Sequence, residues 1–127
     1  MMFNTSTPVP LRGIMDLGVF HESLREYRSS ERICTIVFTD GQEYNRSFTP
    51  EQRPICVCVH PRDKDIILFG TEDGMIVAFS VSERMKVWEL YAIHQSKVHK
   101  IATLSNGTTC YWQTVSNQST IPEVIDL

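Results

Sequence analysis

Short apolar segments alternate with polar turns along most of the chain from residue 33 onward. The segments are rich in β-branched and aromatic residues, and they occupy residues 33–38, 55–60, 65–70, 75–81, 86–93, 97–104 and 108–115. A more polar segment at residues 42–48 fits a strand at the edge of a sheet. The connections between residues 55 and 93 are too short for a helical crossover, so consecutive strands there pair antiparallel. The pattern predicts an all-β fold of antiparallel four-stranded meanders.

The connection Glu72-Asp73-Gly74 has two interpretations, a pair of catalytic acids or a turn between strands. Asp-Gly between two apolar strands favours a hairpin turn because glycine adopts a positive φ at little cost. Adjacent carboxylates in a turn point apart and lie in solvent. Such a setting does not raise the pKa of either carboxyl group, as a general acid requires. The turn is the better interpretation.

The segment before residue 33 is ambiguous. Residues 1–12 contain prolines, serines and threonines and predict an extended lead-in. In residues 13–30, the apolar side chains at Leu17, Phe20, Leu24 and Tyr27 have spacings of three and four, which favours a helix over two poorly patterned strands. We therefore expect an N-terminal extension over 1–32 that is partly helical, a sheet region over 33–115, and a tail or a strand paired elsewhere over 116–127.

The strands recur with a period. Ile55 and Val98 begin equivalent strands 43 residues apart, and Phe38 and Phe79 end equivalent strands 41 residues apart. Four strands in about 40 to 45 residues are typical of a propeller blade.

The stretch ICVCVHPRDKDIILFGTEDGMIVAFSV, residues 55–81, resembles a repeat of the WD40 family. It has an inner strand, a His-Pro turn, a second strand, an Asp-Gly turn and a third strand. The residues that occupy the turn and repeat positions are His60, Pro61, Gly70, Asp73, Gly74, Phe79 and His94. The resemblance covers roughly residues 33–112, as one full repeat and parts of two others.

The sequence departs from the family at three points, one of which is that no histidine precedes Ile55 at the expected distance. Phe79-Ser80 stands where Trp-Asp is typical, and Ile93 precedes His94 in place of glycine. We therefore expect the family's buried Trp, Ser/Thr, His and Asp network to be incomplete. A four-bladed propeller needs about 160 residues at this period, and 127 are present. The alternatives are a fragment or short form of a larger propeller, a piece completed by a partner, and an unrelated β-sheet domain.

Charge and composition exclude several partners. The net charge is −3 and lysines and arginines do not cluster, so no surface for nucleic acid or an anionic membrane is expected. Residues 1–13 lack the features of a secretory signal, and no segment approaches the ~20 apolar residues that span a bilayer. We expect an intracellular protein, cytoplasmic or nuclear, with its four cysteines reduced.

The sharpest candidate ligand set is Cys56, Cys58 and His60, because alternate residues of a strand point to one face. The spacing is tighter than that of usual zinc sites, and Cys110 is the one candidate for a fourth ligand. Buried apolar cysteines and a turn histidine explain the same residues. We therefore predict no metal and no cofactor, and keep a small β-domain that binds a ligand or metal through this face as the alternative.

The sequence carries no nucleophile elbow and no phosphate-binding loop, so we do not expect an enzyme. The favoured function is a protein–protein interaction scaffold or subunit. Its partners would be other proteins, either the rest of a propeller or a subunit of a complex. Binding is expected at any uncovered strand edge and at loop tips. The loop-tip residues are Arg62, Asp63, Lys64, Glu72, Asp73, Glu83 and Arg84.

Overall fold

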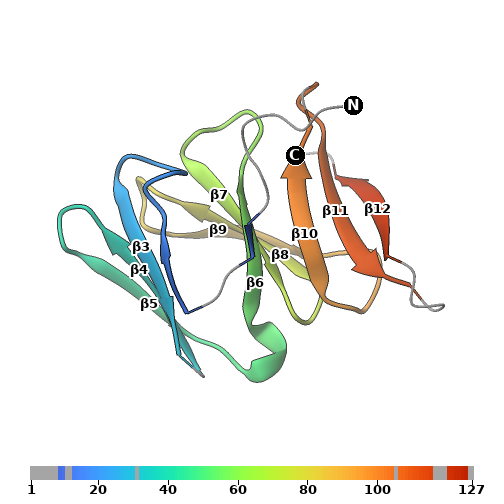
Figure 1. Ribbon diagram of the computed structural model, residues 1–127, viewed down its shortest axis with the longest axis horizontal. Helices are drawn as coiled ribbons and strands as arrows, with labels where there is room; N and C mark the ends of the chain where they lie inside the picture. The colour runs from blue at the N-terminus through green and yellow to red at the C-terminus, as the bar shows by residue number, and fades with distance from the viewer. Residues whose placement is uncertain (1–8, 11–12, 31, 105, 116–119, 126–127) are drawn as a thin grey trace.

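The computed structural model describes residues 9–10, 13–30, 32–104, 106–115 and 120–125, which form three antiparallel sheets. The first sheet contains β2 (Ile14–Asp16), β3 (Leu24–Ser29), β4 (Ile33–Phe38) and β5 (Glu43–Ser47). The second contains β1 (Val9–Pro10), β6 (Pro54–Val59), β7 (Ile66–Thr71), β8 (Met75–Ser80) and β9 (Met85–Tyr91). The third contains β10 (Val98–Thr103), β11 (Thr109–Thr114) and β12 (Thr120–Ile125). The three sheets lie side by side (Figure 1), so the predicted all-β fold of antiparallel meanders is confirmed.

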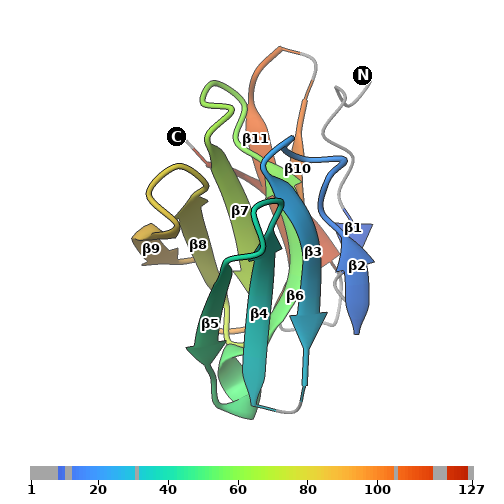
Figure 2. The ribbon, with the colours of Figure 1, turned by 90° about the vertical axis from the view of Figure 1, so that its left-hand side faces the viewer.

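The predicted N-terminal helix is wrong, because residues 14–29 contribute two strands to the first sheet. Figure 2 shows β2 and β3 beside β4 and β5, in the same meander. The pairing of β3 with β4 shifts register between Leu24 and Glu26, so Leu24 and Tyr27 both face the core. This bulge gives a strand the three-residue spacing of a helix. The first unit is therefore a complete four-stranded sheet, and the expected lead-in at residues 1–8 and 11–12 lies outside the described residues.

The C-terminal segment contributes a strand to the third sheet. β12 pairs with β11 along its whole length, from Thr109 opposite Ile125 to Thr114 opposite Thr120. Of the two expectations for residues 116–127, a strand is correct for the described part, residues 120–125. A short 3₁₀ helix, Pro50–Gln52, lies in the connection from the first to the second sheet.

The second sheet is buried on both faces. All six residues of β8 are buried, as expected for a central strand that packs on both sides. Val57, Phe69 and Phe79 pack against the first sheet, and Cys56 and Leu68 belong to a second core with residues of the third sheet. The predicted period of the strands is present. β6 and β10 are the first strands of their meanders, and β4 and β8 are the third strands of theirs.

Tyr27 places an unpaired polar atom inside the first core. Its side chain is 1% exposed and its hydroxyl has no hydrogen-bond partner. Burial, and to a smaller extent the neighbouring Cys34, raise the pKa of Tyr27 above its usual range, while the nearby Ser29 and Arg53 oppose this shift; the Ser29 side chain is outside hydrogen-bond geometry with the hydroxyl. An unpaired buried hydroxyl costs free energy because it has lost its water.

We expect Tyr27→Phe to raise the free energy of unfolding by about 1 kcal/mol, because it removes this unpaired group. Tyr111→Phe is the matched control, since the buried Tyr111 hydroxyl accepts a hydrogen bond from the Ile93 N–H (3.2 Å) and its loss should destabilise the protein. Urea unfolding of both variants measures the contrast. A clear loss of stability in Tyr27→Phe would show that this hydroxyl is bonded.

Candidate protein-interaction sites

The predicted loop residues lie at opposite ends of the second sheet. Residues 62–64 connect β6 to β7, and residues 83–84 connect β8 to β9. Residues 72–73 connect β7 to β8, and successive turns of an antiparallel meander alternate between its two ends. The structure therefore brings together two of the three predicted loops and separates the third.

Asp65 joins the two loops that share an end. Its carboxylate accepts hydrogen bonds from the Ser80 hydroxyl (2.7 Å), the Ser82 hydroxyl (2.8 Å) and the Ser82 N–H (2.8 Å). Burial opposes ionisation, but these hydrogen bonds outweigh it and hold the pKa of Asp65 below its usual value. Nothing near Asp65 in the sequence indicates this role, because its partners lie 15 and 17 residues away.

Arg84 joins the first and second sheets. Its guanidinium forms an ion pair with Asp40 in the β4–β5 turn (2.8 Å) and lies over the Phe38 ring, 4.2 Å from the centroid. It also donates to Gln42 Oε1 (2.7 Å). A hydrogen bond from Arg84, helped by one from the Gln42 N–H, holds the pKa of Asp40 below its usual value. These contacts give Arg84 a role in holding the first and second sheets together.

This ion pair predicts a pH dependence of stability. The folded-state pKa of Asp40 lies below its unfolded value, so the pair contributes fully above about pH 5 and is lost as the pH falls through the folded-state pKa. We expect Arg84→Gln to lower the urea midpoint at pH 7, with the difference from wild type narrowing toward pH 3. The exposed neighbour Arg62, changed to Gln, is the control and should show no such narrowing. A constant difference across this pH range would contradict the role of Asp40.

His60 and Pro61 lie in the β6–β7 turn. His60 Nδ1 accepts the backbone N–H groups of Arg62 (3.0 Å) and Asp63 (3.1 Å), so this nitrogen is unprotonated. Burial lowers the pKa of His60, which favours the same neutral form. The imidazole therefore holds the turn in shape.

Cys56 and Cys58 face the core shared with the third sheet. Their thiols donate to the carbonyl groups of Val98 (3.4 Å) and Val59 (3.6 Å), and burial raises the pKa of each to about 12. Metal ligation and nucleophilic attack both need a thiolate, which this environment disfavours. Among the described residues, no group of three or more His, Cys, Asp or Glu side chains could hold a metal.

Asp73 stabilises the β7–β8 turn. Its carboxylate accepts a hydrogen bond from the Thr71 hydroxyl, which in turn accepts the Met75 N–H (2.9 Å). Gly74 follows with φ of +89°, the conformation that the Asp-Gly pattern predicts. Glu72 is exposed beside them.

Gly70 and Gly74 allow the third sheet to approach the second. A Cβ atom at Gly70 would lie 2.6 Å from Cys56 Sγ and 2.9 Å from Val98 Cβ. One at Gly74 would lie 2.7 Å from the Ser96 carbonyl oxygen. Both glycines therefore stand at the interface of the two sheets.

Gln113 fixes the connection between those sheets. Its side chain is fully buried and donates to the carbonyl groups of His94 (2.8 Å) and Ser96 (2.8 Å). Its oxygen accepts the His94 N–H (3.0 Å). The His94 imidazole lies nearby, with Nε2 3.9 Å from Glu123 Oε1. A polar residue between Trp112 and Thr114 gives no local sign of this role.

Phe79 occupies the position where the family has tryptophan. It is buried, and its ring packs edge-on against Tyr44 (centroids 5.0 Å apart) and stacks on Phe38 (6.3 Å). It therefore anchors the second sheet to the first.

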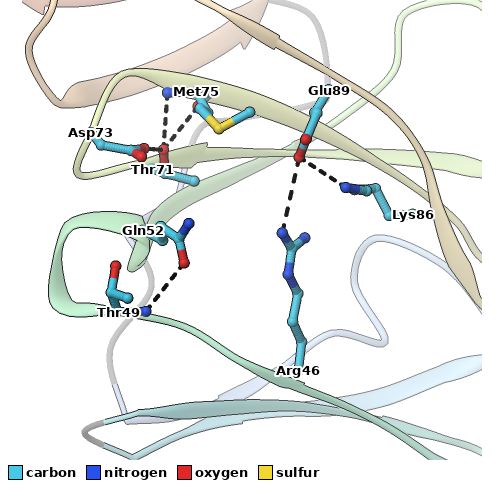
Figure 3. A network of polar contacts seen from close by, with 8 residues as sticks. All are labelled: Arg46, Thr49, Gln52, Thr71, Asp73, Met75, Lys86 and Glu89. Carbon is cyan, nitrogen blue, oxygen red and sulfur yellow. Dashed lines mark hydrogen bonds and ion pairs between the residues drawn. The ribbon is translucent and has the colours of Figure 1, made fainter.

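A cleft of about 150 Å³ remains between the first and second sheets. Most of the buried residues that line it are apolar, namely Cys34, Ile36, Phe48, Phe69, Met75 and Val77; the buried Thr71 also lines it. Figure 3 shows Arg46 of β5 reaching toward Glu89 of β9 across the cleft, with Lys86 beside Glu89. The cleft is thus an apolar space with charged side chains near its opening.

A bulge in β9 places these charges, which is why the sequence did not reveal them. Ala78 pairs with Trp88 but Phe79 pairs with Lys86, so Val87 is an extra residue. Lys86 and Glu89, three residues apart, therefore share the face that lines the cleft, whereas strict alternation would separate them.

The outer faces of the first and third sheets differ in character. On the first sheet, Arg28 pairs with Glu26, and Thr35 donates to Asn45. On the third sheet, the cross-strand neighbours on the outer face are mostly apolar: Ala102, Cys110, Trp112, Pro122 and Val124. Lys100 lies over the Trp112 ring (4.1 Å), and the Val124 side chain is 68% exposed. The outer face of the first sheet thus carries polar side chains together with the exposed Ile14 and Ile33, whereas the cross-strand neighbours named on the third sheet are mostly apolar.

Comparison with known proteins gives a structural match. No protein-family model and no curated protein matches the chain. A chain in the crystal structure of the mitotic checkpoint complex matches with a TM-score of 0.54 and 16% sequence identity. The likeness supports a β-propeller-like fold. The match covers 94% of this chain but spans only 42% of the neighbour's length. At this identity the likeness concerns the fold alone.

The described residues also include no helix long and apolar enough to cross a membrane.

Proposed function

We propose that this chain is a non-enzymatic protein-interaction module whose protein partner docks on the outer face of the third sheet. The observation that carries the proposal is the contrast between the two ends of the array. The second sheet is covered on both faces, and the outer face of the first has hydrogen-bonded polar side chains beside the exposed Ile14 and Ile33. On the third sheet, Val124 is 68% exposed beside the exposed Pro122, while Ala102 and Cys110 next to them are buried; exposed apolar side chains of this kind mark interaction sites.

The partner chemistry follows from this surface. An apolar sheet face packs best against another sheet or helix with an apolar face. The free edge of β12 is the weaker attachment point, because Pro122 has no N–H to donate. We therefore infer that the partner covers the face, either as further sheets of a propeller or as a subunit of a complex. The solved neighbour belongs to a protein complex, which supports a protein partner.

The chemistry of the described residues favours binding over catalysis. The Cys56 and Cys58 thiols are buried with raised pKa values, and Asp73 is occupied in a turn. The net charge of −3 does not favour nucleic acid or anionic lipid. All four cysteines are free, which supports an intracellular location.

The loop residues remain a prediction for additional contacts. Arg62, Lys64, Glu72 and Glu83 are exposed and can take part, and Asp63 is exposed with its carboxylate accepting the Asp65 N–H (3.0 Å). Arg84 and Asp73 serve the fold, as their hydrogen bonds show, so a partner would have to compete for them.

The test compares two charge substitutions on opposite ends of the array. Val124→Glu places a charge on the apolar face, and Asn45→Glu places one on the polar face; both positions are exposed, so both variants should fold. In cell extract, we expect size-exclusion chromatography to find the wild type and Asn45→Glu in a larger complex and Val124→Glu at the mass of the free chain. If Val124→Glu stays in the complex, the proposed docking face is wrong.

A further inference from the structure

The cleft between the first and second sheets has the size of one aromatic side chain. Its volume is about 150 Å³, and a cavity of this size with aliphatic and aromatic walls accommodates benzene. Most of the buried residues that line this cleft are apolar, among them Phe69, Met75 and Val77, so an aromatic ring finds apolar contacts there; the polar Tyr27, Gln52 and Thr71 also line it. A free ligand of this size would bury little surface, whereas a side chain on a protein segment gains further contacts outside the cleft.

The charged side chains at the opening differ in how firmly they are held by neighbouring groups. The Glu89 carboxylate forms an ion pair with Lys86 Nζ at 3.0 Å, and the Asp73 carboxylate accepts a hydrogen bond from the Thr71 hydroxyl. The Arg46 guanidinium lies 3.9 Å from Glu89, which is too long for a hydrogen bond. With both acids engaged, Arg46 is the charge best placed to turn toward a ligand, and a guanidinium binds carboxylates.

The aromatic residues at the opening suit a peptide. Tyr91 is 74% exposed and Tyr44 is half-buried, and both line the cleft. Exposed tyrosines provide large contact areas at low entropic cost in protein interfaces.

We propose that this cleft binds a phenylalanine side chain of a partner segment, with an adjacent carboxylate of that segment paired to Arg46. The carboxylate is the segment's C-terminus or an acidic side chain next to the phenylalanine. The site is separate from the outer face of the third sheet and does not depend on it.

The test uses N-acetylphenylalanine, which carries a ring and a carboxylate, and N-acetylphenylalanine amide, which lacks the charge. Each is titrated into the full 127-residue chain at pH 7 and low salt, and binding is followed by NMR of the backbone amides. We expect the amide signals of cleft residues such as Ile36 and Val77 to shift with both compounds. The acid should bind about threefold more tightly than the amide, because its carboxylate forms a partly exposed ion pair with Arg46 and such pairs add little affinity.

Arg46→Ala should remove the preference for the acid and leave the binding of the amide unchanged. Arg28→Ala is the matched control, because Arg28 lies on the polar outer face of the same sheet, and it should keep the preference. N-acetylglycine, which has the carboxylate but no ring, should not shift the cleft signals.

Three outcomes would overturn the proposal. They are the absence of shifts in the cleft with either aromatic compound, equal affinity of wild type for acid and amide, and an unchanged preference in Arg46→Ala. None of them bears on the third sheet, which the Val124→Glu variant tests separately.

Discussion

Replacing Gly70 with alanine is expected to cost about 3 kcal/mol of unfolding free energy and to lower the melting temperature by about 10 °C. The added Cβ atom would lie within 3.0 Å of three atoms, Cys56 Sγ, Val98 Cγ1 and Val98 Cβ. The Val98 Cβ is held by the backbone of β10, so relief requires that the third sheet move away from the second. A methyl group forced into a packed interface is destabilising even though alanine is small.

The control for Gly70→Ala is Gly18→Ala. The nearest atom to a Cβ at Gly18 is the side-chain Oδ1 of Asp16, at 3.1 Å, so relief requires only that this exposed side chain shift and weaken its hydrogen bond from the Gly18 N–H, a smaller cost than moving a sheet. Thermal unfolding followed by circular dichroism measures both variants. Equal melting temperatures for the two would mean that the second and third sheets do not approach at Gly70 as described.

Replacing Gln113 with alanine is expected to cost about 2 to 3 kcal/mol. The change leaves the two carbonyl groups and the N–H that Gln113 binds at residues 94 and 96 without their partner, and it removes a fully buried side chain. Because these backbone groups are in a half-buried connection, water can replace part of the lost bonding, which limits the cost.

Gln95→Ala is the control in the same connection. Gln95 is exposed, so its loss should change stability by no more than about 0.5 kcal/mol. Urea unfolding gives both free energies, and hydrogen exchange at the His94 amide reports the local effect, which should be faster in Gln113→Ala only. A variant Gln113→Ala with wild-type stability and exchange would show that Gln113 does not fix this connection.

The sequence predicted the elements that local chemistry determines. The apolar run of β8 and the Asp-Gly turn before it follow from β propensity and from the positive φ of Gly74. The spacing of Phe38 and Phe79 located the third strands of two successive sheets. These features depend on residues close together in the chain, so they could be predicted from the sequence without knowledge of the fold.

Features that depend on register or on distant residues could not be predicted. The bulge in β3 gave Leu24 and Tyr27 a helical spacing, and the bulge in β9 moved Lys86 and Glu89 to one face. Arg84 and Asp40 are 44 residues apart in sequence, so nothing near Arg84 indicates that it is engaged. The candidate sites consist largely of such contacts.

Site-specific photo-crosslinking tests the proposed docking face most directly. A photoreactive phenylalanine analogue replaces Val124 on the outer face of the third sheet in one variant and Asn45 on the polar face of the first sheet in another. In native extract, we predict a discrete protein crosslinked from position 124 and none from position 45. A crosslink from position 45 alone, or equal products from both positions, would contradict the assignment of the third sheet as the interaction surface.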